Sequence, residues 1–294
     1  MKVLLLGANG QLGTDLHRVL ATQGHTVIPT IHAELDICDS DKLHELIVSS
    51  NCDVVINTAA FHKVEACEEQ AARAFQVNAL GARNLARACA HRGCVLVHFS
   101  TDYVFDGRQR KPYAEDDLPR PLNVYGVSKL AGEHLIAASS ERYFVIRTCG
   151  LYGIAGSGGK GGNFVENMLK KAWQGVPLRV VNDQVLTPTF TVDLAEAVNR
   201  LIRTREYGLY HITSEGECSW YTFAKTIFEF EKLKVDLTPV STDEFPSPVK
   251  RPLYSVLRKQ RLQKVGLSMP AWKDGLGRYL AARHILSRPA AITP

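Results

Sequence analysis

Residues 2–13 read Lys2-Val-Leu-Leu-Leu-Gly-Ala-Asn-Gly-Gln-Leu-Gly13, and they are the strongest indication of the fold in this chain of 294 residues. Its apolar run at residues 3–6 predicts a buried strand, and a helical pattern begins shortly after it, at residue 11. Three glycines follow the strand, where an ordinary turn would need one. Gly7 would allow a tight turn, Gly10 would let the backbone approach a pyrophosphate, and Gly13, at the start of the helix, would permit close helix–strand packing. The helix N-terminus would then face the phosphates, which predicts dinucleotide binding. The expected cofactor contacts here are Gly7, Asn9, Gly10, Gln11, Leu12 and Gly13.

The same alternation of apolar runs and helical patterns continues to about residue 150. Strands are expected at residues 3–6, 26–31, 53–57, 95–100 and 144–148, and helices at 11–23, 40–50, 71–91 and 125–138. Continuous Val, Leu and Ile runs between helices are typical of a parallel sheet covered on both faces. We therefore expect an α/β fold, a doubly wound, Rossmann-like parallel sheet, with residues 1–150 forming an NAD(P)-binding domain.

The second half of the chain is less regular. Residues 151–294 predict a smaller C-terminal substrate-binding lobe, with segments at about 180–205 returning to the main domain. A glycine-rich loop is expected at 153–162, and a disordered tail from about residue 284, where periodicity is absent.

Composition is typical of a water-soluble globular protein, with 45% hydrophobic and 22% charged residues. The net charge of +5 is scattered, which argues against a nucleic-acid partner. No apolar run approaches the roughly 20 residues that a membrane span needs, and the N-terminal run is too short for a signal peptide. Seven cysteines without metal-ligand spacing are typical of reduced core thiols, so we expect a cytoplasmic protein with no membrane contact.

The second strand informs the choice of nicotinamide cofactor. NAD-selective sites usually place a carboxylate at its end to hold the ribose 2′-hydroxyl. The stretch Thr26-Val-Ile-Pro-Thr-Ile-His32 has no acid, which favours NADPH and leaves NADH as an alternative. Asp36, in Leu35-Asp36-Ile37, is a possible contact to the adenine edge, and a helix cap or turn is an equally good interpretation.

Two later segments carry the expected chemistry. Ser100 and Thr101 end the fourth strand, and ligands of open α/β sheets lie at the carboxyl ends of strands. Tyr125 and Lys129 are four apart, so they share one face of a helix. An ammonium beside a phenol lowers its pKa, and such a phenol can exchange a proton near neutral pH. Alone, this spacing is as consistent with chance as with catalysis.

Together these segments make the chain resemble the extended short-chain dehydrogenase/reductase family and, within it, the dTDP-4-dehydrorhamnose reductases. The other matching segments are Leu35-Asp36-Ile37, Asn57-Thr-Ala-Ala60, Val64-Glu-Ala-Cys-Glu68, Val77-Asn78, Ser100-Thr-Asp-Tyr-Val-Phe-Asp-Gly107, Pro121-Leu-Asn-Val-Tyr-Gly126, Asn182-Asp-Gln184, Pro188-Thr189 and Arg251-Pro252 with Ser255. They follow the family's order and span roughly residues 1–280.

The resemblance implies a role for each matching residue in the reduction of a C4 keto group. Tyr125 would be the general acid, Lys129 would lower its pKa and hold the nicotinamide ribose, and Thr101 would hydrogen-bond the carbonyl oxygen. The implied cofactor contacts are Asp36, Ile37, Ala59, Ala60, Asn78, Tyr125 and Lys129. The implied contacts to a nucleotide-sugar are Val64, Thr101, Asp102, Asn123 and Arg251. The resemblance thus implies a role in dTDP-rhamnose and polysaccharide biosynthesis, with dTDP-4-dehydrorhamnose reduced to dTDP-L-rhamnose.

Departures from the family pattern leave alternatives open. The reductases commonly carry Ser-Trp after Arg147-Thr148, whereas this chain has Cys149-Gly150, so a related nucleotide-sugar reductase or epimerase acting on another sugar is an alternative. A non-catalytic regulatory relative is a second alternative. Tyr103 stands where 4,6-dehydratases place a carboxylic acid, which favours a simple reductase. A homodimer is common in the family. Some members are reported with Mg²⁺ at a subunit interface, but no matching carboxylate set is present, so no metal ligands are predicted.

Overall fold

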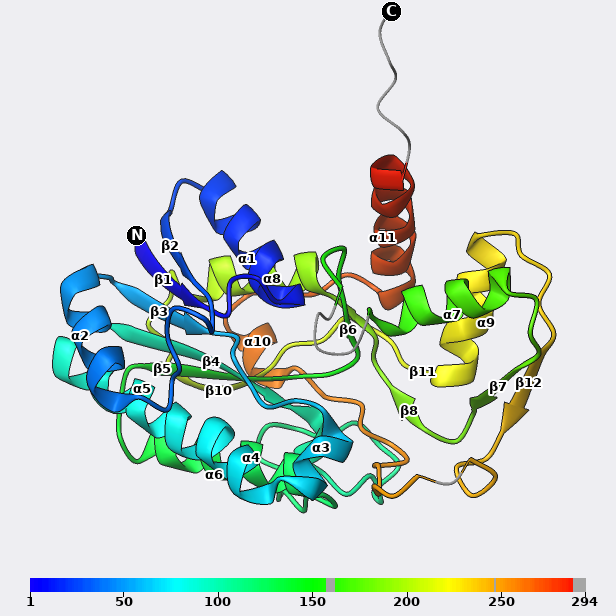
Figure 1. Cartoon of the computed structure of the whole chain (residues 1–294), viewed down its shortest axis with the longest axis horizontal. Coiled ribbons are helices and arrows are strands. Elements are labelled where there is room, and N and C mark those ends of the chain that lie inside the picture. Colours follow the sequence, from blue (N-terminus) through cyan, green and yellow to red (C-terminus); the bar gives the residue numbers. More distant parts are fainter. Residues whose placement is uncertain (157–161, 246, 288–294) are drawn as a thin grey trace, which may run out of the picture.

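A central parallel sheet organises the computed structural model, which describes residues 1–156, 162–245 and 247–287 (Figure 1). Its six strands run in the order β10-β5-β4-β3-β1-β2. Their bounds are β1 Lys2–Leu6, β2 Thr26–Thr30, β3 Val54–Asn57, β4 Val95–Thr101, β5 Tyr143–Thr148 and β10 Gly208–His211. All neighbours pair in parallel, so the expected doubly wound sheet is confirmed.

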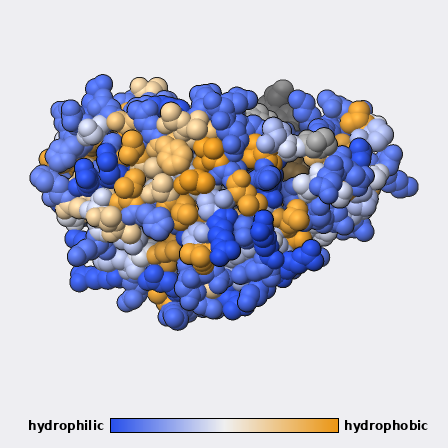
Figure 2. Space-filling view, turned by 90° about the horizontal axis from the view of Figure 1, so that it is seen from below, coloured by the Kyte–Doolittle hydropathy of each residue, from blue (hydrophilic) through white to orange (hydrophobic). Residues whose placement is uncertain are grey.

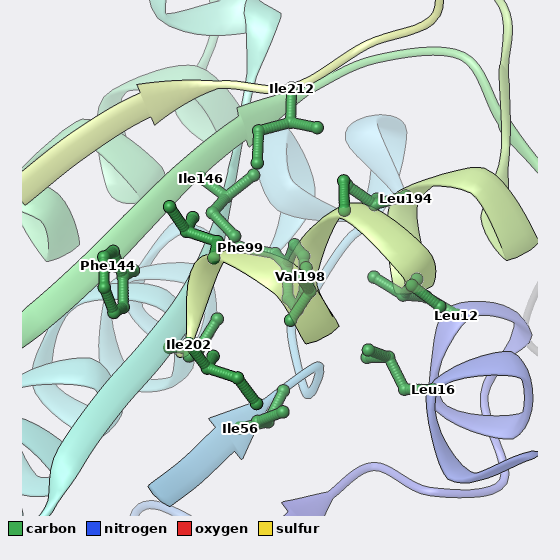
Figure 3. Close-up of a cluster of buried hydrophobic side chains, with 14 of the residues drawn as sticks. Leu12, Leu16, Ile56, Phe99, Phe144, Ile146, Leu194, Val198, Ile202 and Ile212 are labelled. Carbon is green, nitrogen blue, oxygen red and sulfur yellow. The ribbon is translucent and has the colours of Figure 1, made fainter. Parts of the chain in front are cut away.

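Helices cover both faces of this sheet because alternate strand residues point to opposite sides. One core joins Val3, Leu5 and Ile56 of the strands to α1 and α8, and it includes Leu16 and Val198 (Figure 3). The other core, on the opposite face, joins the intervening strand residues to α2, α5 and α6. The bounds of these helices are α1 Gln11–Thr22, α2 Ser40–Ser50, α5 Ala82–Arg92, α6 Val124–Ala137 and α8 Thr191–Leu201.

The segment expected as one long helix at 71–91 is interrupted. It consists of α4 (Ala71–Phe75), a π-helical turn η1 (Gln76–Gly81) and α5. π-Helical turns inside α-helices are frequent at functional sites. Here the turn carries Asn78, whose backbone carbonyl lies against Gly132 of α6: a Cβ on Gly132 would lie 2.2 Å from that oxygen.

A second cluster of helices lies to the right in Figure 1 and has its own core. It comprises α7 (Phe164–Trp173), α9 (Trp220–Phe230) and α11 (Trp272–Ser287), with the parallel pair β7 (Leu178–Val181) and β12 (Leu237–Val240). The tail expected from residue 284 is helical up to residue 287, and residues 288–294 lie outside the described part of the chain. Residues 157–161 of the expected glycine-rich loop also lie outside it.

The remaining elements are short. They are α3 Val64–Glu69, η2 Asp102–Val104, β6 Leu151–Tyr152, β8 Val185–Leu186, β9 Thr189–Phe190, β11 Cys218–Ser219 and α10 Gln260–Lys264.

The face that carries α3, α4 and α6 presents apolar side chains to solvent. Seen from below, apolar residues gather on this side of the molecule (Figure 2). Phe75 of α4, Leu80 of η1 and Val127 of α6 are among the exposed large apolar side chains. None of the helices within the described ranges has the length and apolar character of a bilayer-spanning segment.

Candidate active site

The carboxyl ends of β1, β3 and β4 meet at one edge of the sheet. The strand register aligns Leu6 with Asn57 and Asn57 with His98, so the residues that follow these positions become neighbours. The glycine turn, the stretch 58–60 and Thr101 therefore lie together at the edge where parallel sheets bind ligands.

The glycine turn has the shape that a dinucleotide needs. Gly7 adopts φ +77°, which glycine tolerates best, and a Cβ on Gly13 would lie 2.2 Å from the Gly7 carbonyl oxygen. Gly10 caps α1 without any side-chain hydrogen bond, and no acidic residue occupies the first turn of the helix. The N-terminus of α1 therefore offers backbone N–H groups and positive dipole to an anion. Asn9 of the turn is exposed, Leu12 is buried, and Gln11 donates through Nε2 to the Leu151 carbonyl at 3.0 Å.

Asp36 lies after β2, as expected, and it already has a cationic partner. Its carboxylate accepts hydrogen bonds from the Cys38 N–H at 2.9 Å and from Arg73 Nη2 of α4 at 3.0 Å. Burial works to raise the pKa of this carboxyl, but the Cys38 N–H and the guanidinium prevail and lower it. Arg73 thus places a positive charge close to the expected adenosine end, a position that periodicity alone did not single out. Ile37 is buried against Gly81.

The segment that follows β3 is anchored by Asn78. Its amide donates to the Phe61 carbonyl and to Ser128 Oγ of α6, and its Oδ1 accepts from the Phe61 N–H at 2.9 Å. Ala59 and Ala60 are partly exposed directly before this anchored segment. The π-helical turn therefore fixes the backbone that borders the expected cofactor groove.

Thr101 and Tyr125 are brought together from β4 and α6. Thr101 is buried, and its hydroxyl lies close enough to the phenol of Tyr125 to influence its pKa. The Tyr125 ring lies edge-on to Tyr103, with the ring centroids 5.9 Å apart. Burial raises the pKa of Tyr125, and the Thr101 hydroxyl only partly offsets this effect. The phenol is therefore held protonated and can serve as a proton donor.

Lys129 has its closest polar contact with a residue other than Tyr125. Lys129 is 2% exposed and its Nζ lies 3.0 Å from Nε2 of His98, a residue of β4. Burial lowers the pKa of Lys129 to about 8, while the nearby Glu133 carboxylate acts to raise it. The i,i+4 spacing does put both residues on α6, but burial, which sequence spacing does not report, dominates the pKa of each.

Two of the expected substrate contacts are occupied by other partners. Asp102 is 4% exposed, and its carboxylate accepts from Thr101 Oγ1 at 3.1 Å and Ser255 Oγ at 2.6 Å. Asn123 is the N-cap of α6: its Oδ1 accepts from the Gly126 N–H at 2.8 Å. Its Nδ2 donates to the Lys250 carbonyl. Both residues join the sheet edge to the segment that follows residue 247.

The remaining expected substrate contacts lie at α3. Val64 begins this helix and is 8% exposed. Arg251 forms an ion pair with Glu65 of the same helix and a hydrogen bond of 2.6 Å to Ser247 Oγ. The guanidinium thus lies beside the sheet edge, held by a carboxylate.

The structure adds residues that pattern reasoning did not single out. Asn57, His98 and Lys129 form a buried chain of hydrogen bonds. Next to this chain, the Glu133 carboxylate of α6 accepts two hydrogen bonds from Arg147 of β5. They join Nε to Oε1 at 3.0 Å and Nη2 to Oε2 at 2.7 Å. His98 lies between the apolar residues Val97 and Phe99 of β4. A polar residue at such a position in a buried strand could have identified it as a candidate site residue.

Cys149 and Gly150 stand where the family pattern commonly has Ser-Trp. Cys149 is buried and donates from Sγ to the Thr187 carbonyl at 3.1 Å. Gly150 adopts φ +58°, and a Cβ there would lie 2.9 Å from the Leu186 side chain and 3.0 Å from Pro188. The stretch around β8 therefore lies where a larger side chain at position 150 would begin.

No group of three or more His, Cys, Asp or Glu side chains is arranged to hold a metal ion in the part of the chain that the structure describes.

Known proteins share this sequence and this fold over nearly the whole chain. The family model described as RmlD substrate binding domain matches residues 1–285. The spore coat polysaccharide biosynthesis protein SpsK of Bacillus subtilis is 40% identical over 282 residues, which cover 96% of this chain and 98% of that protein.

Solved structures of reductases are also similar to this chain over nearly its whole length. A dTDP-4-dehydrorhamnose reductase from Clostridium acetobutylicum is 42% identical, with a TM-score of 0.92 over 97% of this chain and 100% of that one. The Bacillus anthracis dTDP-4-dehydrorhamnose reductase, solved in complex with NADP, is 38% identical with a TM-score of 0.91, covering 96% and 99% of the two chains.

Proposed function

The chain belongs to the RmlD substrate binding domain family, and on this basis we propose that it reduces the C4 keto group of a dTDP-linked 4-keto-6-deoxy sugar with NADPH. The proposed reaction converts dTDP-4-dehydrorhamnose to dTDP-L-rhamnose. One observation carries the proposal: a protonated phenol, Tyr125, lies beside the Thr101 hydroxyl at the sheet edge that also bears the glycine turn. That arrangement supports proton delivery to a carbonyl oxygen beside a bound dinucleotide.

The residues have distinct roles in the proposed mechanism. The Thr101 hydroxyl orients the substrate carbonyl by a hydrogen bond to its oxygen, and that bond strengthens as the oxygen gains charge. Tyr125 gives its phenolic proton to the same oxygen. Bound NADPH supplies the hydride that adds to C4. Lys129 stabilises the phenolate that remains, because an ammonium on the same helix face favours the charged form.

The cofactor assignment rests on the glycine turn and on Arg73. The turn would hold the pyrophosphate against the N-terminus of α1, with Ala59, Ala60 and Asn78 along the rest of the groove. The end of β2 brings no carboxylate that would repel a 2′-phosphate, and Arg73 supplies a cation near Asp36. The Bacillus anthracis relative, solved with NADP, supports the same preference.

The sugar is the finer part of the proposal. Gly150 has the space neither for an aromatic side chain nor for a Cβ, because Leu186 and Pro188 occupy it. A related 4-keto sugar is therefore the second candidate substrate, with the same proton donor.

A substrate panel tests both candidates. Purified protein would be mixed with NADPH or NADH and with dTDP-4-dehydrorhamnose or other nucleotide-linked 4-keto-6-deoxy sugars, while the loss of reduced-nicotinamide absorbance is followed. Fastest turnover with NADPH and dTDP-4-dehydrorhamnose is expected. Turnover of another sugar alone would identify the second candidate. If the folded protein bound cofactor but reduced none of the sugars, a non-catalytic regulatory role would replace the proposed reaction.

A further inference from the structure

A one-way chain of hydrogen bonds runs from the backbone to Lys129. The Ala59 N–H donates to Asn57 Oδ1 at 3.0 Å. Asn57 Nδ2 lies 3.0 Å from His98 Nδ1, and His98 Nε2 lies 3.0 Å from Lys129 Nζ. Asn57, His98 and Lys129 are each no more than 2% exposed, so water does not supply substitute partners.

The backbone fixes the direction of this chain. Turning the Asn57 amide over would place its NH₂ group against the Ala59 N–H, leaving two donors facing each other. The Asn57 oxygen must therefore face Ala59, and its Nδ2 must donate to His98 Nδ1. Burial holds the pKa of His98 well below its usual value, so the ring carries one proton. With Nδ1 accepting, that proton is on Nε2.

The Nε2–H of His98 then points at the lysine nitrogen. An ammonium has three donors and no lone pair, so it cannot accept this hydrogen bond. Only the free amine form of Lys129 completes the chain.

We propose that Asn57 and His98 act as positioning residues that stabilise the neutral amine form of Lys129 in the cofactor-free enzyme, and that at mildly alkaline pH, where this form predominates, Lys129 takes up one proton from solvent when the cofactor binds. The second half of this proposal rests on the proposed function. Cofactor hydroxyl and phosphate oxygens are acceptors and favour the ammonium. Protonation removes the lone pair that His98 uses, so it also releases Lys129 from His98. The charged form is the one that can stabilise a Tyr125 phenolate.

The other charged groups around Lys129 are consistent with this switch. On α6 the titratable neighbours are Tyr125 and Glu133, and the negative charge of Glu133 is balanced by Arg147 of β5. From α3, Cys67 lies near Tyr125. Burial lowers the pKa of Lys129 to about 8, so the neutral amine predominates above that pH and a ligand that favours the ammonium can return the proton there.

Nitrogen NMR of the cofactor-free protein tests the resting state without any activity. Long-range proton–nitrogen correlations of the His98 ring should show the proton on Nε2. Asn57→Asp offers a carboxylate, which can only accept, and should place a proton on Nδ1. An Nδ1 proton or a doubly protonated ring in the wild-type protein would overturn the proposal, whatever the enzyme reduces.

Proton uptake tests the switch itself. Calorimetry of NADPH binding near pH 9, in two buffers of different ionisation enthalpy, should report uptake close to one proton per chain, because the resting amine is then mostly neutral. His98→Leu removes the donor, raises the Lys129 pKa and should lower this uptake. It should also move the alkaline fall of kcat/KM to higher pH by roughly half to one unit.

A matched control separates this effect from general damage. His25 is also buried, with Nε2 2.9 Å from Asn199 Oδ1, but it lies at the end of α1 away from Lys129. His25→Leu should leave the uptake and the pH profile unchanged. Absent uptake in the wild type, or equal uptake in His98→Leu, would refute the switch, and the nitrogen spectrum remains decisive if the His98 variant fails to fold.

Discussion

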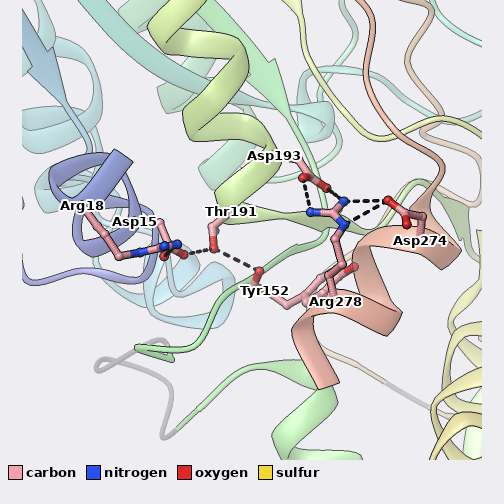
Figure 4. A network of polar contacts seen from close by, with 7 residues as sticks. All are labelled: Asp15, Arg18, Tyr152, Thr191, Asp193, Asp274 and Arg278. Carbon is pink, nitrogen blue, oxygen red and sulfur yellow. Dashed lines mark hydrogen bonds and ion pairs between the residues drawn. The ribbon is translucent and has the colours of Figure 1, made fainter. Parts of the chain in front are cut away.

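Arg278 of α11 donates two hydrogen bonds to the Asp193 carboxylate of α8, from Nη1 to Oδ1 at 2.7 Å and from Nη2 to Oδ2 at 2.8 Å (Figure 4). The carboxylate is buried while the guanidinium is 43% exposed and also reaches Asp274. Because α8 packs on the main sheet and α11 belongs to the second cluster of helices, this pair joins the two parts of the molecule.

Arg278→Ala should destabilise the protein, because it leaves the Asp193 charge buried without its partner. Loss of one member of a buried pair costs about 3–5 kcal/mol, and the exposure of Arg278 reduces the expected loss to about 1–3 kcal/mol. Urea unfolding would measure it. Arg18→Ala is the control. Arg18 also pairs with a buried aspartate, Asp15, but Arg18 is 62% exposed and Asp15 keeps a hydrogen bond from Thr191, so its loss should cost less than about 1 kcal/mol. Equal losses in the two variants would mean that the Arg278 pair does not join the two parts.

Tyr125→Phe should remove the proton donor and leave the pocket shape unchanged. A general acid contributes about 10²–10⁴-fold, so kcat should fall by that factor while NADPH binding persists. Steady-state kinetics and calorimetry measure the two quantities. Tyr113→Phe, which removes a phenol bonded to Asp106 outside the site, should leave turnover close to wild type. Unchanged turnover in Tyr125→Phe would rule out the proposed acid.

Gly13→Ala should damage both stability and cofactor binding. The new Cβ would meet the Gly7 carbonyl oxygen at 2.2 Å, and backbone atoms cannot move aside as a flexible side chain can. Overpacking of this kind costs about 1–3 kcal/mol, and the displaced turn should weaken NADPH binding. Gly277→Ala on α11 is the matched control, since its nearest atom would be 3.9 Å away and helix propensity should add about 0.5–1 kcal/mol. Tight cofactor binding by Gly13→Ala would show that the turn does not contact the phosphates.

Asp102 should make the protein less stable as the pH rises. Burial raises its pKa from 3.8 to about 6, and the Ser255 and Thr101 hydroxyls offset only part of this. A folded-state pKa above the unfolded value stabilises the fold below pH 3.8, and this contribution is lost as the pH rises through about 6. Asp102→Asn keeps an acceptor for Ser255 and should therefore be more stable than wild type above pH 6, by about 2–3 kcal/mol. The two proteins should converge near pH 4. Thermal unfolding from pH 4 to 8 measures this, and parallel curves would contradict the assignment.

Local sequence patterns were sufficient for the architecture. Mostly apolar segments of four to six residues predicted strands β1 to β5 because buried parallel strands carry no polar face, and the glycine spacing predicted the turn at Gly7–Gly13. The interruption at η1 was missed, since a π-helical turn preserves the helical composition of its segment. Its cause is tertiary: α6 packs against the Asn78 carbonyl through Gly132.

Local sequence patterns did not predict contacts between side chains that lie far apart in the sequence. Asp102 accepts a hydrogen bond from Ser255, 153 residues away, a contact that spacing along the chain does not predict. Arg73 reaches Asp36, and Arg278 reaches Asp193, across 37 and 85 residues. Each pair depends on where two elements finally lie, and spacing along the chain carries no information about that.

The sequence by itself determined that Tyr125 and Lys129 share a helix face behind a glycine turn, because helical spacing is a local property. The protonation of those two residues, by contrast, depends on the tertiary structure. The pKa of a side chain depends on burial and on partners from other strands. Burial raises the pKa of Tyr125 and lowers that of Lys129, and the amide of Asn57, aligned by strand pairing, sets the proton of His98 against the lysine.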